Sequence, residues 1–223
     1  MKTKAKSEET QALILDTALG LFRKKGFEET TMREIASAAG VALGAAYYYY
    51  DSKPALVMTF YERAQREMEP AIRDGLASST SLEKRLRVLI DAKFQCFLPN
   101  RQLLSALSAH ADPEHPLSPF SKRTRGIREQ DIRFFSEAIE GSRQRITADL
   151  KPYMPRLLWV YQMGLILFWV YDRSKNQWRT RALFEKSLSI VVTLIRLASF
   201  PLLKPVRKLI VDLLRVVYGE DEG

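Results

Sequence analysis

The sequence predicts an all-α protein in which an N-terminal three-helix domain with a helix-turn-helix is joined to a larger helical domain. Three observations support this class. Apolar residues recur at helical spacing through most of the chain, no stretch of alternating β-branched residues stands out, and Gly26 and Gly40 fall where helical patterns stop. With 223 residues, of which 46% are apolar, the chain is long enough for one sizeable domain or a small domain joined to a larger one.

The N-terminal elements follow from caps and breakers. A first helix is predicted from about Glu8 to Lys25, and Gly26 ends it. The segment 31–34 fits a capping box that opens a short second helix reaching residue 39. After Gly40, a third helix begins near Leu43, and the Asp-Ser-Lys-Pro sequence at 51–54 ends it and starts a fourth helix. Two short helices across a tight turn, supported by longer ones, are typical of a helix-turn-helix.

The C-terminal part continues as helices near 81–98, 100–111, 118–141, 155–172, 180–199 and 203–218, with clear loops at 110–119 and 171–180. The two most apolar helices, 155–172 and 180–199, are joined by a short polar loop, which predicts an antiparallel hairpin. We expect its outer face to meet a two-fold mate, with purely intramolecular packing as the alternative. The expected interface residues are Leu158, Leu165, Phe168, Trp169, Leu188, Val191, Val192 and Ile195.

Composition limits the possible functions. The net charge of +9 suggests nucleic acid, but the excess is one charge in residues 1–53, two in 54–150 and six in 151–223, so charge alone does not identify a DNA-binding segment. A single cysteine, Cys96, suits a reducing cytoplasm. The longest uncharged run, 157–171, is shorter than the ~20 residues that cross a bilayer, and the polar N-terminus does not resemble a secretory signal, so we expect no membrane partner.

An enzyme finds no support, because the chain has two histidines in one loop and lacks a Gly-rich phosphate loop. The loop residues His110, Asp112, Glu114 and His115 are of types that bind metals, but the prolines among them favour a polar loop. We expect no metal and no cofactor. The basic amphipathic helix at 203–218 is interpreted as a packed terminal helix, with binding to a membrane surface as the alternative.

The sequence YYYY at 47–50 carries the functional prediction. Successive helical residues turn by about 100°, so the four rings cannot share one face. Tyr49 and Tyr50 fall on one side with Ala45 and Ala46, and the other side presents the remaining two tyrosines with Leu43 and Gly44. A DNA major groove accepts such a helix, with phenol hydroxyls donating to phosphates and small or apolar residues near base edges. The alternative is that these rings are partly buried at an intramolecular interface.

Residues 14–56 resemble the DNA-binding region of the tetracycline-repressor family of bacterial transcription regulators. The motif residues that carry the resemblance are Ala18, Phe22, Gly26, Phe27, Thr31, Ile35, Ala36, Ala39, Gly40, Val41, Tyr47, Tyr49, Tyr50, Ser52 and Lys53. The resemblance implies that Leu43 and Gly44 face bases, that Tyr47, Tyr48 and Lys53 hold the DNA backbone, and that Thr31 and Arg33 reach a phosphate or base edge. Ala42 departs from the family's capping Ser or Thr, and Ala45, like Leu43, stands where the family often has a polar residue that contacts DNA.

The resemblance further implies a DNA-binding domain over 1–52 and an effector-binding and dimerisation domain over 53–223. The candidate pocket residues, each of which could equally be ordinary core, are Phe94, Phe97, Leu104, Phe134, Phe135, Trp159 and Tyr161. The expected function is a dimeric, ligand-responsive cytoplasmic regulator, a repressor, that binds a near-palindromic double-stranded operator and is released by a small apolar or aromatic effector. The alternative is a helical carrier of lipids or other hydrophobes with no DNA function.

Overall fold

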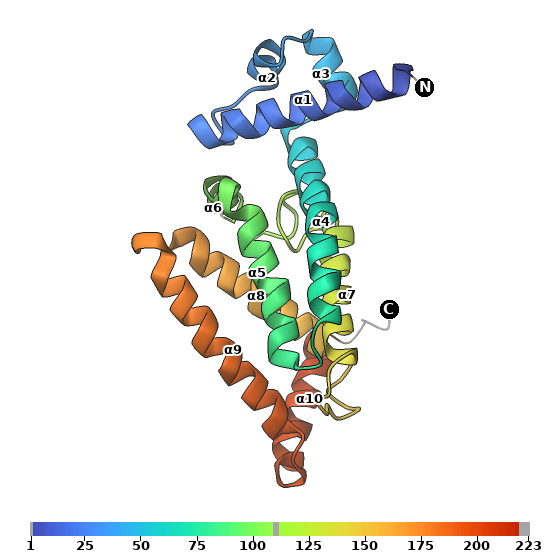
Figure 1. Cartoon of the computed structure of the whole chain (residues 1–223), viewed down its shortest axis with the longest axis vertical. Helices are drawn as coiled ribbons and strands as arrows, with labels where there is room; N and C mark the ends of the chain where they lie inside the picture. The colour runs from blue at the N-terminus through green and yellow to red at the C-terminus, as the bar shows by residue number, and fades with distance from the viewer. Residues whose placement is uncertain (1, 109–111, 219–223) are drawn as a thin grey trace. The chain divides into compact units, whose positions relative to one another are not determined.

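The structure, a computed structural model, describes residues 2–108 and 112–218, and within these ranges every regular element is helical (Figure 1). This confirms the predicted all-α class. The α-helices are α1 (Lys2–Lys25), α2 (Met32–Ala38), α3 (Leu43–Tyr49), α4 (Lys53–Ala77), α5 (Leu82–Phe97), α6 (Arg101–Ser108), α7 (Arg125–Glu140), α8 (Met154–Tyr171), α9 (Trp178–Ala198) and α10 (Lys204–Tyr218). Short 3₁₀ turns precede α6, α9 and α10: η1 (Leu98–Asn100), η2 (Lys175–Gln177) and η3 (Pro201–Leu203).

The chain forms two compact units, each built from two segments. The first unit contains Met1–Glu69 and Gln95–Arg128, and the second contains Pro70–Phe94 and Glu129–Gly223. The expected functional boundary after residue 52 coincides with the start of α4, whereas the compact units divide within that continuous helix. The boundary between DNA-binding and effector functions therefore stays a prediction.

In the first unit, α1, α2 and α3 pack around a core of fully buried apolar side chains. The core includes Ile14, Leu19 and Phe22 of α1, Ile35 of α2 and Ala46 of α3, which are all buried. The helix ends lie where the glycines predicted them, because Gly26 (φ +91) and Gly40 (φ +67) adopt the left-handed conformation that other residues rarely tolerate. The sequence pattern thus places three helices around one core and leaves the outer side of α3 to solvent.

The segment 118–124 corrects one expectation. A helix was predicted to begin near 118, but α7 begins at Arg125. The buried hydroxyls of Ser118, Ser121 and Thr124 instead bond to backbone groups of a turn, and Thr124 Oγ1 donates to Ser118 O at 2.7 Å. Hydroxyl side chains that bond locally in this way compete with the helical pattern and extend the loop.

The second unit is held by charged side chains as well as by apolar packing. The buried guanidinium of Arg85 donates to the carbonyls of Ala138 (2.8 Å) and Glu137 (2.7 Å) near the end of α7, and to Ser79 O (2.9 Å) just after α4. Carbonyls near helix C-termini have no partner within their own helix, and they favour a cation. Lys93 and Asp131 form a second buried contact, with Nζ 2.8 Å from Oδ1.

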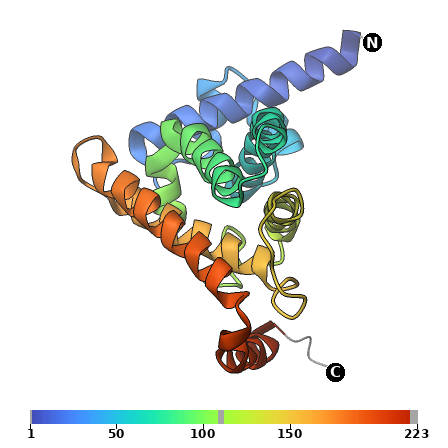
Figure 2. The ribbon, with the colours of Figure 1, turned by 60° about the horizontal axis from the view of Figure 1, so that its bottom comes forward.

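Helices α8 and α9 form the predicted antiparallel hairpin (Figures 1 and 2). Asp172 orders the connection, because its carboxylate accepts from Ser174 N (2.8 Å), Thr180 N (2.9 Å) and Thr180 Oγ1 (2.7 Å). Burial works to raise the pKa of Asp172, but the hydrogen bonds from Thr180 and Ser174 outweigh it, and the pKa is lowered. The turn therefore depends on an ionised carboxylate.

Candidate nucleic-acid interface and effector region

Helix α3 divides its four tyrosines between two faces, as the sequence predicts. Tyr48 is 81% exposed and Tyr47 is 49% exposed, and Leu43 and Gly44 lie on the same outer side. Ala46 and Tyr50 are buried, and Tyr49 is half-buried with its ring edge-on to Tyr48. The outer face therefore offers two phenols on either side of a position that has no side chain.

The hydroxyl groups of the two inner tyrosines have hydrogen-bond partners within the first unit. Tyr50 Oη donates to Gln11 O of α1 at 3.1 Å, and Tyr49 Oη lies 3.2 Å from Ser7 Oγ. Burial raises the pKa of Tyr50 to about 12, so its proton stays in place to hold that bond. These two rings fix α3 on α1, which leaves only Tyr47 and Tyr48 available to an external partner.

Gly44 is not required by packing inside the chain. A Cβ built at this position meets no atom of the described residues within 4 Å, and its φ is not in the left-handed region. Glycine here costs helix stability relative to alanine, by about 0.5–1 kcal/mol. Ala42 adds to this weakness, because it occupies the N-cap in an extended conformation (φ −63, ψ 144) without a side chain that could bond to the free N–H groups.

The start of α2 is fixed by the predicted capping box. Thr31 Oγ1 accepts from Glu34 N at 3.3 Å, and Thr31 N donates to Glu34 Oε2 at 2.9 Å. Lys25 Nζ donates to the same carboxylate at 2.5 Å, and the bonds from Lys25 and Thr31 lower the pKa of Glu34 to about 2. Thr31 is therefore committed to the helix start, while the neighbouring Arg33 is exposed and can reach outward.

Lys53 has an internal role that the sequence pattern does not reveal. Its Nζ donates to Phe27 O at 2.8 Å and to Glu28 O at 3.1 Å, and it lies 4.6 Å from the centre of the Phe27 ring. The ammonium thus fastens the start of α4 to the turn between α1 and α2. A Lys ammonium has three donors, so one N–H remains for the phosphate contact that the resemblance implies.

The expected effector residues fall into the two units. Phe97 and Leu104 are buried in the first unit, where Phe97 packs on Phe60 at 5.7 Å. The others belong to the second unit: Phe134, Phe135 and Trp159 are buried, Tyr161 Oη lies 2.7 Å from Ser187 Oγ, and Phe94 packs on Trp169 (5.2 Å) and Phe184 (6.0 Å). Their role in binding an effector stays a prediction.

One polar residue of α8 was missed by sequence reasoning. Gln162 is 1% exposed, and its amide nitrogen has no hydrogen-bond partner among the described residues. It lies on the inward stripe of α8 with Leu158, Leu165 and Trp169, which are all buried. An isolated glutamine within an apolar run is the only signal that the sequence offered. A buried amide without a partner is costly, so its presence calls for an explanation.

The structure buries most of the expected dimer residues within the chain, and their role in a dimer stays a prediction. Leu158, Leu165, Trp169, Leu188, Val192 and Ile195 are buried within the chain itself, Val191 is half-buried, and Phe168 is exposed at 42%. The first six side chains make the core of the second unit and do not lie on the outer face. That face instead carries other large apolar side chains: Val160, Leu167, Tyr171, Leu183, Ile190, Leu194 and Leu197.

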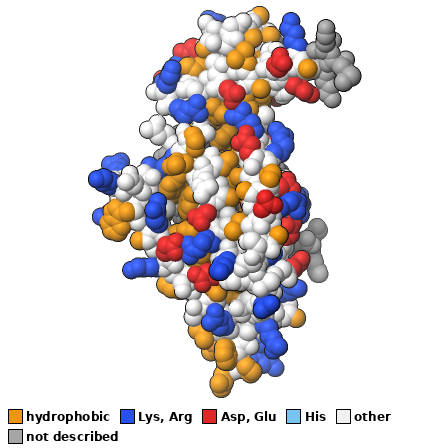
Figure 3. Space-filling view, viewed as in Figure 1, with side chains coloured by type: hydrophobic (Ala, Val, Ile, Leu, Met, Phe, Trp, Pro, Cys, Tyr) orange, Lys and Arg blue, Asp and Glu red, His pale blue; other side chains and the backbone are white. Residues whose placement is uncertain are grey.

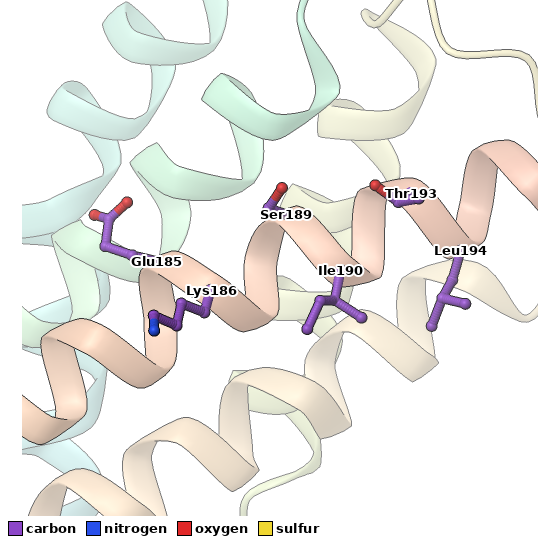
Figure 4. A pocket seen from close by; sticks show the side chains of 6 residues that line it. All are labelled: Glu185, Lys186, Ser189, Ile190, Thr193 and Leu194. Atoms are coloured by element: carbon purple, nitrogen blue, oxygen red, sulfur yellow. The ribbon is translucent and has the colours of Figure 1, made fainter.

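Two shallow grooves mark the outer face of the hairpin. The groove on α9 is lined by Glu185, Lys186, Ser189, Ile190, Thr193 and Leu194. In Figure 4 they form two rows along the helix, with Glu185, Ser189 and Thr193 in one row and Lys186, Ile190 and Leu194 in the other. The groove on α8 is lined by Gly164, Leu167, Phe168, Tyr171, Asp172, Arg173 and Arg179. Small residues between large apolar ones leave room for side chains of an opposing helix.

Neither a metal-binding cluster nor a single membrane-spanning helix is found among the described residues. Of the loop residues with metal-binding side chains, His110 lies outside the described residues, and no cluster of three or more His, Cys, Asp or Glu side chains occurs elsewhere in the described chain. Over 2–108 and 112–218, no single helix has the length and apolar character to span a membrane. The consecutive segments Lys175–Ala198 and Pro201–Tyr218 are long and apolar enough only when taken together, and they are bent by 89° relative to each other.

Comparison with known proteins identifies both parts of the chain. Residues 14–58 match the family model described as bacterial regulatory proteins of the tetR family. Residues 85–213, more than half of the chain, match the model described as the C-terminal domain of tetracyclin repressor-like proteins. The two matches together cover the region of the outer α3 face and most of the second unit.

Individual relatives agree with the family models. The regulator AcrR of Shigella flexneri is 42% identical over 64 residues, which are 29% of this chain and 30% of that protein. The chain thus aligns with only about a third of the length of this curated relative. NalD of Pseudomonas aeruginosa, a secondary repressor of the MexAB-OprM multidrug efflux pump, is 25% identical, with a TM-score of 0.57 over 82% of this chain and 95% of its own. FadR of Bacillus subtilis, solved with stearoyl-CoA, is 17% identical, with a TM-score of 0.60 over 81% of this chain and 97% of its own.

Proposed function

Because the chain belongs to the tetracycline-repressor family of transcriptional regulators, we propose that it binds a near-palindromic operator as a homodimer and releases it when a small molecule enters the helical domain. Its family is one of regulators and not of enzymes. Cytoplasmic action follows from the need to reach DNA. Repression is the direction of control that we propose, in line with the relatives whose names state it.

The observation that carries the proposal is the outer face of α3. Tyr47 and Tyr48 are exposed phenols on either side of Gly44, and Leu43 and the half-buried Ala45 extend this surface toward the start of the helix. Phenol hydroxyls donate to phosphate oxygens, whereas a glycine lets the helix backbone approach base edges closely. Because this face carries little charge, base recognition depends on methyl contacts and DNA shape.

Charged contacts with the DNA backbone come from neighbouring elements. Arg33 is exposed on α2, and Lys53, the first residue of α4, has a third donor beyond those that bond to Phe27 O and Glu28 O. Thr31, which caps α2, is exposed, but its hydroxyl already donates to Glu34 Oε2, so its remaining acceptor capacity suits an amino group at a base edge and not a phosphate. A single α3 reads few base pairs, so two copies spaced by one helical turn of DNA, about 34–36 Å, provide an operator of useful length.

The proposed dimer surface is the outer face of the α8–α9 hairpin. Phe168, Ile190, Leu194 and Leu197 are exposed apolar residues on it, and Ser189 and Thr193 line the groove between them. Exposed apolar patches bordered by polar residues are typical of protein interfaces. This set replaces the buried residues that the sequence alone suggested.

The proposed effector is a mainly apolar molecule held among the aromatic residues of the second unit. Phe94, Trp169 and Phe184 form a connected aromatic cluster, and Gln162 supplies an unpartnered amide on the inward stripe of α8. Ligand sites of this kind are mostly apolar, with a few polar groups that fix the orientation. An effector releases DNA only if it binds better to the conformer that holds the two α3 helices out of register, a coupling of about 1–3 kcal/mol.

The test begins with selection of bound duplexes from a random DNA pool. Affinity for the selected duplex is then measured by fluorescence anisotropy over a range of salt concentrations for the wild type, Arg33→Ala and Tyr48→Phe. We expect Arg33→Ala to weaken binding to all sequences and to lower the salt slope by about one ion, and Tyr48→Phe to weaken binding without changing the slope.

A control variant separates a specific contact from a general loss of charge. Arg133 is an exposed cation on α7 of the second unit, so Arg133→Ala should leave the salt slope and the affinity nearly unchanged. If no duplex is selected, or if Arg33→Ala and Arg133→Ala behave alike, the proposed DNA interface is refuted. A hydrophobe carrier without DNA function would give the first of these outcomes.

A further inference from the structure

Helix α10 carries apolar side chains on two different faces. The inner face contributes Val211 and Leu214, which pack with Leu150 in a small core surrounded by Tyr153 and Ala198, among others. The outer face carries six more apolar side chains, exposed from 42% to 83%: Val206, Leu209, Ile210, Leu213, Val216 and Val217. We call these six residues the α10 seam. Its size exceeds the single exposed apolar residues that are normal on a surface.

The rest of the second unit fixes the direction in which the α10 seam faces. Arg207, on the inner side of the helix, donates from Nε to Asp149 Oδ2 at 2.9 Å and from Nη1 to Ala198 O at 2.8 Å. Together with buried Val211 and Leu214, these bonds hold α10 to the end of α9. The helix cannot turn the seam inward without breaking them, so the seam is presented outward.

The spacing within the α10 seam is that of a helix–helix contact. Positions 206, 209, 213 and 216 follow the alternating three- and four-residue steps of a heptad repeat, and 210 and 217 widen the stripe on one side. Such a stripe is suited to the side of another helix, where each residue enters a gap between residues of the partner.

The charges beside the seam favour a protein over a lipid surface. At about 100° per residue, Asp212 lies about 100° from the centre of the seam, whereas Lys204, Lys208 and Arg215 lie about 140–180° from it. Helices that rest on membranes usually carry Lys and Arg along the border of the apolar face. Here the nearest charged residue is acidic and pairs with Arg215 at 3.4 Å. The other border is the inner face, whose cation, Arg207, is paired with Asp149.

The seam also continues the proposed dimer surface. Exposed apolar residues follow one another from Ile190 through Leu194, Leu197, Phe200 and Leu202 to Val206, across the 89° bend between α9 and α10. Figure 3 shows hydrophobic side chains gathered where α9 passes into η3, with basic side chains beside them. We propose that the α10 seam packs on a second copy of this chain, so that α10 forms part of the dimer interface. This inference rests on the proposed dimer.

The test compares dimer dissociation constants obtained by sedimentation over a range of concentrations. The seam variant combines Leu209→Glu with Leu213→Glu, and the matched control is Lys208→Glu, which changes charge on the polar face of the same helix. Because all three side chains are exposed, we expect the helicity of both variants to stay close to that of the wild type. The seam variant should raise the dissociation constant at least tenfold, and the control should change it by less than threefold.

The outcomes separate this inference from the function on which it rests. If the wild type is a dimer and the seam variant dissociates like the wild type, the α10 inference is refuted and the proposed dimer stands. A monomeric wild type refutes both. Flotation with vesicles of phosphatidylcholine and phosphatidylglycerol tests whether a lipid surface contacts the α10 seam instead. If the wild type binds the vesicles, the seam variant does not, and the dimer dissociation constants are equal, the seam binds lipid and the inference is overturned.

Discussion

Substitution of Gly44 by alanine separates the stability of α3 from its proposed use. Position 44 has helical backbone angles, and a Cβ there meets no atom of the described residues within 4 Å. Alanine therefore adds its helix preference without a clash, which should raise the unfolding free energy by about 0.5–1 kcal/mol. Packing within the helix domain therefore does not explain why position 44 is a glycine, and the explanation lies in a contact outside the chain.

Contact with DNA supplies such a reason. On a helix with about 100° per residue, position 44 lies between Tyr47 and Tyr48, at the centre of the outer face. A methyl group there separates the backbone from whatever the face approaches, and extra methyl groups in close-packed contacts cost about 1–3 kcal/mol. Operator affinity should fall by about tenfold or more, since about 1.4 kcal/mol corresponds to a factor of ten.

The assay measures both quantities on the same protein. Chemical denaturation gives the unfolding free energy, and fluorescence anisotropy with the selected duplex gives the affinity. Gly20→Ala is the control, because Gly20 lies inside α1 and its added Cβ meets, among the described residues, only the end of Arg23 at 4.0 Å. The control should gain stability with unchanged affinity. A Gly44→Ala protein that binds the operator as tightly as the wild type would refute close approach at this position.

Three further predictions concern caps and the buried amide. Ala42→Ser should add the missing N-cap of α3 and raise the unfolding free energy by about 1 kcal/mol, as measured by urea denaturation; an unchanged midpoint would show that the serine does not cap. Glu34, whose pKa is about 2 instead of its usual 4.5, should stabilise the protein above pH 4.5 and lose this effect as pH falls toward 2. The thermal midpoints of the wild type and Glu34→Gln should accordingly converge over that range, and a gap that persists at pH 2 would contradict the assignment. Gln162→Leu should raise the unfolding free energy of the ligand-free protein by about 1–3 kcal/mol, because it removes a buried amide without a partner, while weakening effector-induced release of DNA. A destabilised Gln162→Leu protein would count against this account of the amide.

Local patterns in the sequence were sufficient for several features because their causes are local. The glycine stops at 26 and 40, the capping box at Thr31 and the division of the tyrosines at 47–50 depend on backbone angles, neighbouring side chains and the helical repeat. Each of these features depends on interactions that span only a few residues, so the sequence by itself determined them.

Only the tertiary structure decided what each helix face meets. Lys53 donates hydrogen bonds to carbonyls 25 and 26 residues earlier in the chain. The amide nitrogen of Gln162 is buried without a hydrogen-bond partner among the described residues, because of packing that no local pattern describes. Helices α8 and α9 are apolar on more than one side, so periodicity could not distinguish the buried Leu188 from the exposed Ile190. The same holds for α10, where the core selects Leu214 and leaves the α10 seam outside. A helical repeat specifies which residues share a face, but the choice of the buried face depends on neighbours far away in the sequence.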